Sequence, residues 1–158
     1  MKTLATAILI FTLPIISQSR SLAQEVKWTT FENLNDSIRK APKPILVFIH
    51  ASWCKFCKMQ DVNTFKNPEV AHKISSDYYA LRLDGESKEQ IKFLNRTYRF
   101  KASGPQTGTH ELAEFLGKKN GSMTYPTTVF LSPQLEIAGK KTGFISAKNL
   151  LDIINSKF

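Results

Sequence analysis

The stretch of sequence that decides the fold is VFIHASWCKFCK, Val47–Lys58. It runs from an apolar segment into two cysteines, Cys54 and Cys57, which are the only two in a chain of 158 residues. A disulfide between them would close a very small loop and would restrict few unfolded conformations. Such a bridge stabilises a fold less than a long-range one does. A role as a structural staple therefore explains the pair poorly.

The residues around the pair predict a buried strand followed by a helix. Ile45–Ile49 is a continuous apolar run rich in β-branched residues, which is typical of a central strand covered on both faces. Cys54–Phe65 is predicted to be helical. Cys54 would then stand at a helix N-terminus, where unpaired backbone N–H groups and the helix dipole favour an anionic sulfur. Because Lys55 and Lys58 add positive charge, we expect a lowered pKa for the Cys54 thiol.

The spacing of the cysteines predicts thiol–disulfide chemistry. Cys57 lies one helical turn beyond Cys54, so the two sulfurs are within reach of each other. A thiolate at Cys54 attacks a disulfide, and Cys57, which we expect to be the more buried, then displaces the mixed disulfide. Trp53 either covers the sulfurs and offers an apolar contact to a partner, or packs at the rim of the site.

The rest of the chain predicts further strands and helices around this centre. The other expected strands are Trp28–Phe31 (a short strand or a lead-in), Tyr78–Leu83, Thr127–Leu131 and Leu135–Lys141. The other expected helices are Phe31–Lys40, a helix from Pro68 through Ile74, a helix capped by Ser87 with the buried stripe Ile91, Leu94 and Tyr98, Thr109–Lys118, and a last helix capped by Ser146. This order indicates an α/β domain with helices on both faces of one mixed sheet.

The N-terminus predicts export. After a positively charged start, Leu4–Ile16 is apolar, and Ser21–Ala23 provides small residues for cleavage. An uncleaved membrane anchor is disfavoured, because the run is shorter than the roughly 20 residues of a spanning helix and Pro14 interrupts it. We therefore expect a signal peptide over residues 1–23 and one soluble domain over residues 24–158.

Charge and ligand counts argue against two classes of function. The chain has a formal net charge of +9, and 20 basic and 13 acidic residues (net +7) remain after residue 23. The basic residues are scattered and do not form the clustered stripe of a nucleic-acid site. Structural zinc requires four ligands, but there is no second cysteine pair, and His50, His72 and His110 fall in three predicted elements. We expect neither a nucleic-acid partner nor a metal.

Three motifs resemble the thioredoxin superfamily. VFIHASWCKFCK is similar to that family's active-site region, and TYPTTVFL, Thr124–Leu131, resembles its later strand, which begins with a cis-proline facing the cysteines. NTFKNPEV, Asn63–Val70, is similar to exported thioredoxin-like domains related to the C-terminal domain of the bacterial transmembrane thiol-disulfide interchange reductase. The resemblance covers nearly all of Trp28–Phe158.

The resemblance implies a thioredoxin fold, in which helices flank a central mixed sheet, with a helical insertion before the cis-proline strand. It implies that Cys54 is the attacking thiol and Cys57 the resolving thiol. It also implies a cis bond at Pro126, next to which the backbone of Tyr125 pairs with an extended substrate chain. Together with Trp53, these two residues are the expected substrate-binding residues.

The implied function is that of an exported thiol–disulfide oxidoreductase that exchanges disulfides of client proteins, with reduction preferred over oxidation. Its implied partners are protein thiols and disulfides and a membrane thiol electron donor. We expect a periplasmic monomer that needs no cofactor. The alternative is a non-catalytic binding module that uses the same fold as a docking surface.

The sequence departs from thioredoxin at the two residues that help remove the proton of the resolving thiol. Phe48 stands at the place of a buried aspartate, six residues before the first cysteine, and Ala80 stands at the place of its partner lysine. His50 is either a substitute proton acceptor or a packed or surface histidine. Lys55-Phe56 matches the dipeptide of neither the reducing thioredoxins nor the common oxidants, which leaves the direction of exchange open.

The segment Lys101–Ser122 is longer than thioredoxin requires. Because it precedes the strand with Pro126, it either overhangs the cysteines and selects partners or forms an inert surface excursion. His110 and Glu111 open its predicted helix, and we expect them to be capping and solvated groups and not ligands.

Overall fold

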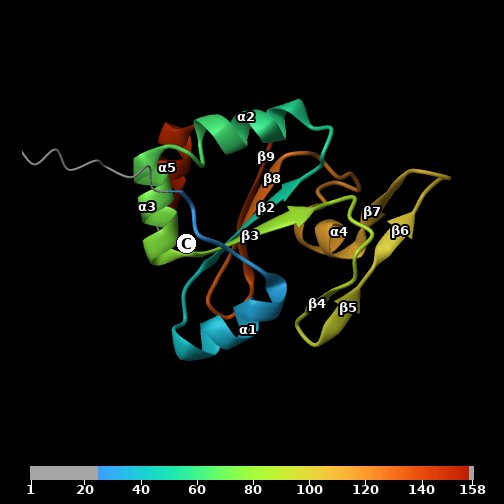
Figure 1. Ribbon diagram of the computed structural model, residues 1–158, viewed down its shortest axis with the longest axis horizontal. Coiled ribbons are helices and arrows are strands. Elements are labelled where there is room, and N and C mark those ends of the chain that lie inside the picture. The colour runs from blue at the N-terminus through green and yellow to red at the C-terminus, as the bar shows by residue number, and fades with distance from the viewer. Residues whose placement is uncertain (1–24, 157–158) are drawn as a thin grey trace, which may run out of the picture.

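The computed structural model describes residues 25–156, so the predicted signal peptide lies outside the described residues (Figure 1). The strands are β1 (Trp28–Thr29), β2 (Ile45–His50), β3 (Tyr79–Asp84), β4 (Ile91–Phe93), β5 (Arg96–Tyr98), β6 (Phe100–Ala102), β7 (Gly108–His110), β8 (Thr127–Leu131) and β9 (Ile137–Thr142). The helices are α1 (Phe31–Lys40), α2 (Lys55–Asn63), α3 (Pro68–Asp77), α4 (Glu111–Gly117) and α5 (Ala147–Asn155). Within the described range, no helix is long and apolar enough to cross a bilayer.

Five strands form one mixed sheet in the order β1-β3-β2-β8-β9. The first three strands run parallel, and β8 and β9 join them antiparallel. The side chains of Ile45–Ile49 in β2 are all fully buried, as predicted for a central strand, because helices cover both faces. Leu46 and Phe48 pack in a cluster with residues of α2, α3 and α5. The alternate residues of β2 pack with α1 and α4 on the other face, and Figure 1 shows these two layers.

Side-chain caps explain where the helices begin. The Thr30 hydroxyl caps α1, the Asn67 side chain caps α3 ahead of a proline, and the Ser146 hydroxyl caps α5 as predicted. Each cap side chain accepts a hydrogen bond from a backbone N–H of the first turn that would otherwise lack a partner. These residue types are therefore the local reason for three of the observed helix starts.

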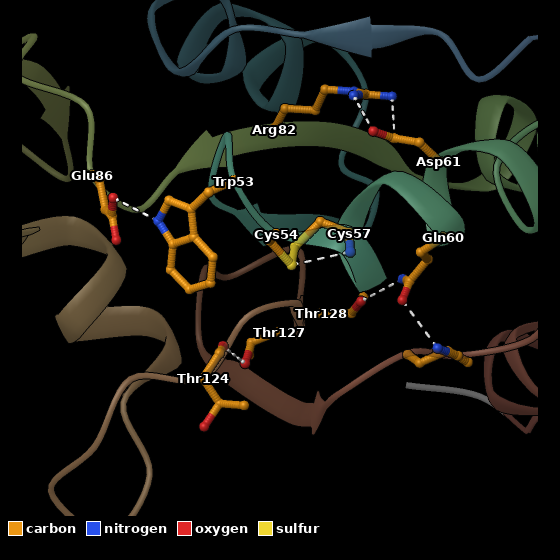
Figure 2. Close-up of a disulfide and its surroundings, with 11 residues drawn as sticks. Trp53, Cys54, Cys57, Gln60, Asp61, Arg82, Glu86, Thr124, Thr127 and Thr128 are labelled. Carbon is orange, nitrogen blue, oxygen red and sulfur yellow. Dashed lines mark hydrogen bonds and ion pairs between the residues drawn. A yellow bond between two sulfur atoms is a disulfide. The ribbon is translucent and has the colours of Figure 1, made fainter.

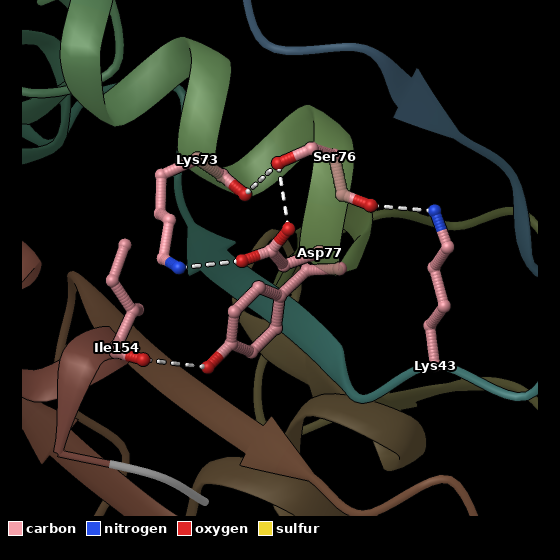
Figure 3. Close-up of polar contacts among 6 residues, drawn as sticks. Lys43, Lys73, Ser76, Asp77 and Ile154 are labelled. Carbon is pink, nitrogen blue, oxygen red and sulfur yellow. Dashed lines mark hydrogen bonds and ion pairs between the residues drawn. The ribbon is translucent and has the colours of Figure 1, made fainter.

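Polar contacts at the end of α3 tie it to its neighbours (Figure 3). Lys73 forms an ion pair with Asp77 at 2.6 Å, one helical turn along. The Lys43 ammonium donates to the Ser76 carbonyl at 2.6 Å, which links the helix to the segment before β2. The Tyr78 hydroxyl donates to the Ile154 carbonyl of α5 at 3.5 Å. The last of these contacts links the end of α3 to α5, on the face of the sheet that also carries α2.

The helix predicted to follow Ser87 is wrong. Its expected stripe lies in an antiparallel hairpin of β4 and β5, which is joined by Leu94 and Asn95 with φ values of 51° and 59°. A two-residue turn with both residues in the left-handed region is the favoured hairpin connection, and asparagine tolerates it well. Phe93 and Tyr98 are buried, whereas Leu94 is 40% exposed at the turn. Apolar residues at this spacing fit either a helix or a hairpin, and the turn at Leu94 and Asn95 makes the segment a hairpin.

The predicted helical insertion before β8 contains more than a helix. β6 and β7 form a second antiparallel hairpin, and α4 begins at Glu111, two residues later than predicted. Leu112, Ala113 and Leu116 are buried in the core on the α1 side of the sheet. The insertion is therefore not an inert surface excursion, because it completes one of the two core clusters.

Candidate active site

The two cysteines form a disulfide at the start of α2, with 5.2 Å between their Cα atoms (Figure 2). Cys54 is the N-cap of the helix, and its Sγ accepts a hydrogen bond from the backbone N–H of Cys57 at 3.1 Å. A donor of the first helical turn thus points at this sulfur, which is the arrangement that favours a thiolate. The two residues are 3% and 2% exposed, so the expected difference in burial between them is absent in the disulfide form.

The segment before Cys54 forms a tight turn out of β2. The backbone N–H of Cys54 donates to the Ala51 carbonyl at 3.1 Å, which turns the chain from the strand into the helix. Ala51 is buried with the cysteines, whereas Lys55 and Phe56 between them are exposed. One face of this turn therefore belongs to the core, and the other is open to a partner.

Trp53, next to Cys54 in the chain, contacts Tyr125, which packs against the core cluster of the cysteines and directly precedes Pro126. The Tyr125–Pro126 peptide bond is cis, which confirms the prediction. The Trp53 indole meets the Tyr125 ring edge-on, with 5.9 Å between the ring centroids. The Trp53 side chain is 63% exposed, so much of the indole is open to a partner, and its covering of the sulfurs stays a prediction. Sequence reasoning missed Glu86, whose carboxylate accepts a 3.0 Å hydrogen bond from the indole N–H (Figure 2).

Tyr125 stays neutral at physiological pH. Its burial, together with the nearby Glu86 and Asp84 carboxylates, raises the pKa of the phenol to about 12. The ring therefore acts as a half-buried aromatic wall and not as an acid.

No group of three or more His, Cys, Asp or Glu side chains within residues 25–156 is arranged to hold a metal ion.

Gly85 makes room for Tyr125, and we expect Gly85→Ala to displace it. A Cβ atom at residue 85 would collide with the Tyr125 hydroxyl and would lie 2.5 Å from ring atom Cε1. Overpacking of this kind costs about 1–3 kcal/mol in free energy of unfolding, which urea denaturation measures. The same substitution in a Tyr125→Ala background should cost far less, because the ring is gone. An equal cost in both backgrounds would contradict the contact.

The place of thioredoxin's buried acid is aromatic in this protein. Phe48 is fully buried, with 4.9 Å between its ring centroid and that of Phe65 and 6.4 Å to that of Trp28. Ala80, at the place of the partner lysine, is fully buried on β3 opposite Leu46. The departure predicted from the sequence is therefore real, and these two positions supply no carboxylate–ammonium pair.

An ion pair missed by sequence reasoning lies on the same side of the sheet. The Arg82 guanidinium of β3 contacts both carboxylate oxygens of Asp61 on α2, at 2.6 and 3.1 Å (Figure 2). It also lies over the Trp28 ring, 4.3 Å from its centroid. The pair thus fixes the outer part of α2 against the sheet.

His50 ends β2 and is half-buried. Its ring stacks on Phe48, with 5.6 Å between centroids and 22° between planes. Burial lowers the pKa of the His50 imidazole, and the Asp84 carboxylate partly opposes this shift. His50 is therefore a packed histidine, while the role of proton acceptor stays a prediction.

We expect His50 to make the protein less stable in mild acid. Because its folded pKa lies below the unfolded value of about 6.5, the unfolded chain binds the proton first as the pH falls. The His50 contribution is therefore fully present above about pH 6.5 and is lost as the pH falls through the folded pKa. Free energies of unfolding measured from pH 8 to pH 5 should fall less steeply for His50→Gln than for the wild type. Parallel curves would contradict this assignment.

Gln60 is a buried polar residue that the sequence did not single out. Its amide donates to the Thr128 hydroxyl of β8 at 3.2 Å, and its carbonyl accepts from the backbone N–H of Ile145 at 3.0 Å (Figure 2). The Thr64 hydroxyl donates to the Ile145 carbonyl at 2.6 Å. α2 is thus pinned to both β8 and the segment before α5.

His110 caps α4, as predicted, but it is fully buried and not solvated, and Glu111 is the first residue of the helix and not a cap. The Nδ1 atom of His110 accepts from the backbone N–H of Leu112 at 3.2 Å, and its Nε2 lies 3.0 Å from the Glu89 carbonyl oxygen. A carboxylate oxygen of Glu111 accepts from the backbone N–H of Arg99 at 2.9 Å. Both side chains are therefore committed to holding the insertion.

Comparisons with known proteins agree with this geometry. A family model described as a thioredoxin-like domain matches residues 31–157. The thiol:disulfide interchange protein DsbD of Campylobacter jejuni is 31% identical over 123 residues, which are 77% of this chain and 17% of that protein. A structure of a DsbH oxidoreductase has a TM-score of 0.56 at 16% identity, covering 96% of this chain and 93% of that one. A Thermus thermophilus thioredoxin has a TM-score of 0.60 at 15% identity, covering 84% and 86%. The two structural matches show the fold alone.

Proposed function

Because the chain belongs to the thioredoxin-like family, we propose that it is an exported thiol–disulfide oxidoreductase that preferentially reduces disulfides of client proteins. The observation that carries this proposal is the Cys54–Cys57 disulfide at the start of α2, with a backbone N–H donated to the Cys54 sulfur. Its similarity to a protein named for thiol:disulfide interchange supports the same chemistry. This chain spans 17% of the length of that relative, so the proposal concerns the chemistry of one domain and not the activity of the whole relative.

In the proposed reaction, the reduced protein starts with two thiols. The Cys54 thiolate attacks one client sulfur, so that a mixed disulfide forms and the other client sulfur leaves as a thiolate and takes up a proton. Cys57 loses its proton and attacks the Cys54 sulfur, which closes the Cys54–Cys57 disulfide and releases the second client thiolate. Two electrons pass from the protein to the client.

We infer that the client chain lies against Trp53, Tyr125 and Pro126. The exposed Trp53 indole offers an apolar surface whose orientation is fixed by its hydrogen bond to Glu86. The neutral phenol of Tyr125 forms the wall behind it. An extended segment beside Tyr125 would use backbone hydrogen bonds for affinity, so that many client sequences fit.

The proposed reaction requires a source of electrons, because each turnover leaves the protein oxidised. We infer that a membrane thiol carrier re-reduces the disulfide, that the predicted signal peptide over residues 1–23 directs the domain over residues 24–158 to the periplasm, and that this domain acts as a monomer. The name of the Campylobacter relative supports thiol–disulfide partners of this kind.

The reduction potential of the Cys54–Cys57 pair, measured against glutathione, tests the direction of exchange. A value near that of thioredoxin, about −270 mV, is expected for a reductant, whereas a value near about −120 mV would make the protein an oxidant. The alternative of a non-catalytic binding module draws support from Phe48 at the place of the buried acid. Equal rates of insulin reduction by the wild type and a Cys54→Ser variant would favour that alternative and refute the proposal that the protein is an enzyme.

A further inference from the structure

The outer face of α2 exposes apolar side chains. Phe56 is 62% exposed and Val62 is 59% exposed, and Trp53 precedes them at the mouth of the site. These are the three most exposed large hydrophobic residues of the described chain. The solvent face of a surface helix is normally polar, and clustered exposed apolar residues mark interaction sites. Phe56 lies in the first turn of α2, and Val62 lies near its end.

A groove of about 460 Å³ lies beside this face, between α2 and the segment that carries β1. We call it the α2 groove. Val26, Trp28 and Phe65 line it, and two of these, Val26 and Phe65, are buried core residues that give it an apolar floor. Val62 stands on its wall with most of its side chain in solvent. The groove is therefore concave, with an apolar floor and an exposed apolar side chain, that of Val62, at its edge.

The rim of the α2 groove carries unmatched positive charge. Lys58 and Lys66 are exposed on the rim, and neither forms an ion pair with another residue in the range 25–156. The Asp61 carboxylate is already neutralised by Arg82. That contact uses two of the five guanidinium N–H donors, so donors remain for a second carboxylate. Glu25 is the one other acid in the lining.

We propose that the α2 groove docks an acidic segment of a partner protein, in which an apolar side chain lies between carboxylates. The apolar side chain would cover the floor at Val26 and Phe65, and the carboxylates would pair with Lys58 and Lys66. A membrane surface fits less well, because the site is concave and a flat lipid surface would not reach its floor. Burial of the exposed Val62 side chain adds to the affinity of the complex.

The groove and the disulfide belong to the same helix. Cys54 caps α2, and Lys58 stands one turn further along. A partner in the groove therefore contacts the element that carries the sulfurs. As the site for a redox partner it rests on the proposed function, but as a binding site for an acidic segment it does not.

Two cysteine-free peptides labelled with fluorescein test the site: Asp-Glu-Phe-Glu-Asp and its counterpart Lys-Lys-Phe-Lys-Lys. We expect the acidic peptide to bind at least about tenfold more tightly than the basic one, and less tightly at high salt. In ¹H–¹⁵N spectra it should shift the backbone amide signals of Val26, Trp28 and Val62. Fluorescence anisotropy gives the affinities, and equal affinities for the two peptides would overturn the proposal.

A charge-reversal pair supplies the matched control. Lys58→Glu/Lys66→Glu should weaken binding of the acidic peptide by about tenfold or more. Lys40→Glu/Lys92→Glu makes the same change in net charge on α1 and β4, which pack on the other face of the sheet, and should change affinity less than about twofold. Circular dichroism checks that both variants fold. Equal losses of peptide affinity in the two double variants would show that overall charge attracts the peptide, and they would overturn the proposed site.

Two further arms separate the remaining outcomes. Binding to phosphatidylglycerol vesicles through Lys58 and Lys66, without binding of the acidic peptide, would replace the protein partner by a membrane. Reduction of 2-hydroxyethyl disulfide by the wild type reports exchange activity alone, since this small neutral disulfide carries no acidic segment. Its failure would refute the proposed function, whereas the peptide affinities decide the groove independently.

Discussion

A Cys57→Ser variant is expected to stop disulfide exchange halfway and to accumulate a mixed disulfide on Cys54. Without the second thiol, the intermediate cannot be resolved from within the protein, so turnover should fall by about 10³-fold or more. The Cys54 sulfur remains at the helix N-terminus, where the backbone N–H groups of the first turn stabilise its thiolate. Insulin with its disulfides intact provides the client, and non-reducing electrophoresis followed by mass spectrometry identifies the adduct.

The Cys54→Ser variant is the matched control for this trap. It keeps a thiol at residue 57, but that residue lies inside the first turn and does not hold the N-cap position of Cys54. We expect no adduct and no turnover from it. An adduct on Cys57 would reverse the assigned roles, and turnover by either variant above the background would refute two-thiol exchange altogether.

A Phe48→Ala variant is expected to lose about 3–5 kcal/mol in free energy of unfolding. The ring is fully buried at the centre of an aromatic group with Trp28, Phe65 and His50. Removing it leaves a cavity beneath α2 that the sheet and the helix are too constrained to fill. Because small domains are stable by only about 5–15 kcal/mol, this loss is large. Urea denaturation followed by far-UV circular dichroism measures it.

Phe56→Ala provides the same chemical change on the surface. Its side chain is 62% exposed on α2, so the substitution should alter the free energy of unfolding by less than about 0.5 kcal/mol. Comparable losses for Phe48→Ala and Phe56→Ala would contradict the burial of one ring and the exposure of the other.

The main sheet and its helices could be predicted because their local signals are strong. The apolar run Ile45–Ile49 has no polar face and is rich in β-branched residues, which favours a strand covered on both sides. Asn67 followed by a proline, and Ser146 before an amphipathic segment, each mark a helix start that the structure has. The hairpins β4–β5 and β6–β7 were missed, because three-residue strands are too short to show alternation.

The cysteines and the cis-proline of the candidate site could be predicted from motifs, but their polar supports could not. Trp53 and Glu86 are separated by 33 residues, and Gln60 and Thr128 by 68. No local pattern marks such partners, since a glutamate or a glutamine in a polar stretch reads as a solvated side chain. The missing buried acid at Phe48 was visible only because a family resemblance said what to expect there.

Gln60 holds α2 in place while the cysteines react at its first turn. Its two hydrogen bonds anchor the helix to β8 and to the segment before α5, three residues beyond Cys57. We therefore expect opening or closing of the disulfide to move the first turn of α2 more than the half of the helix that Gln60 holds.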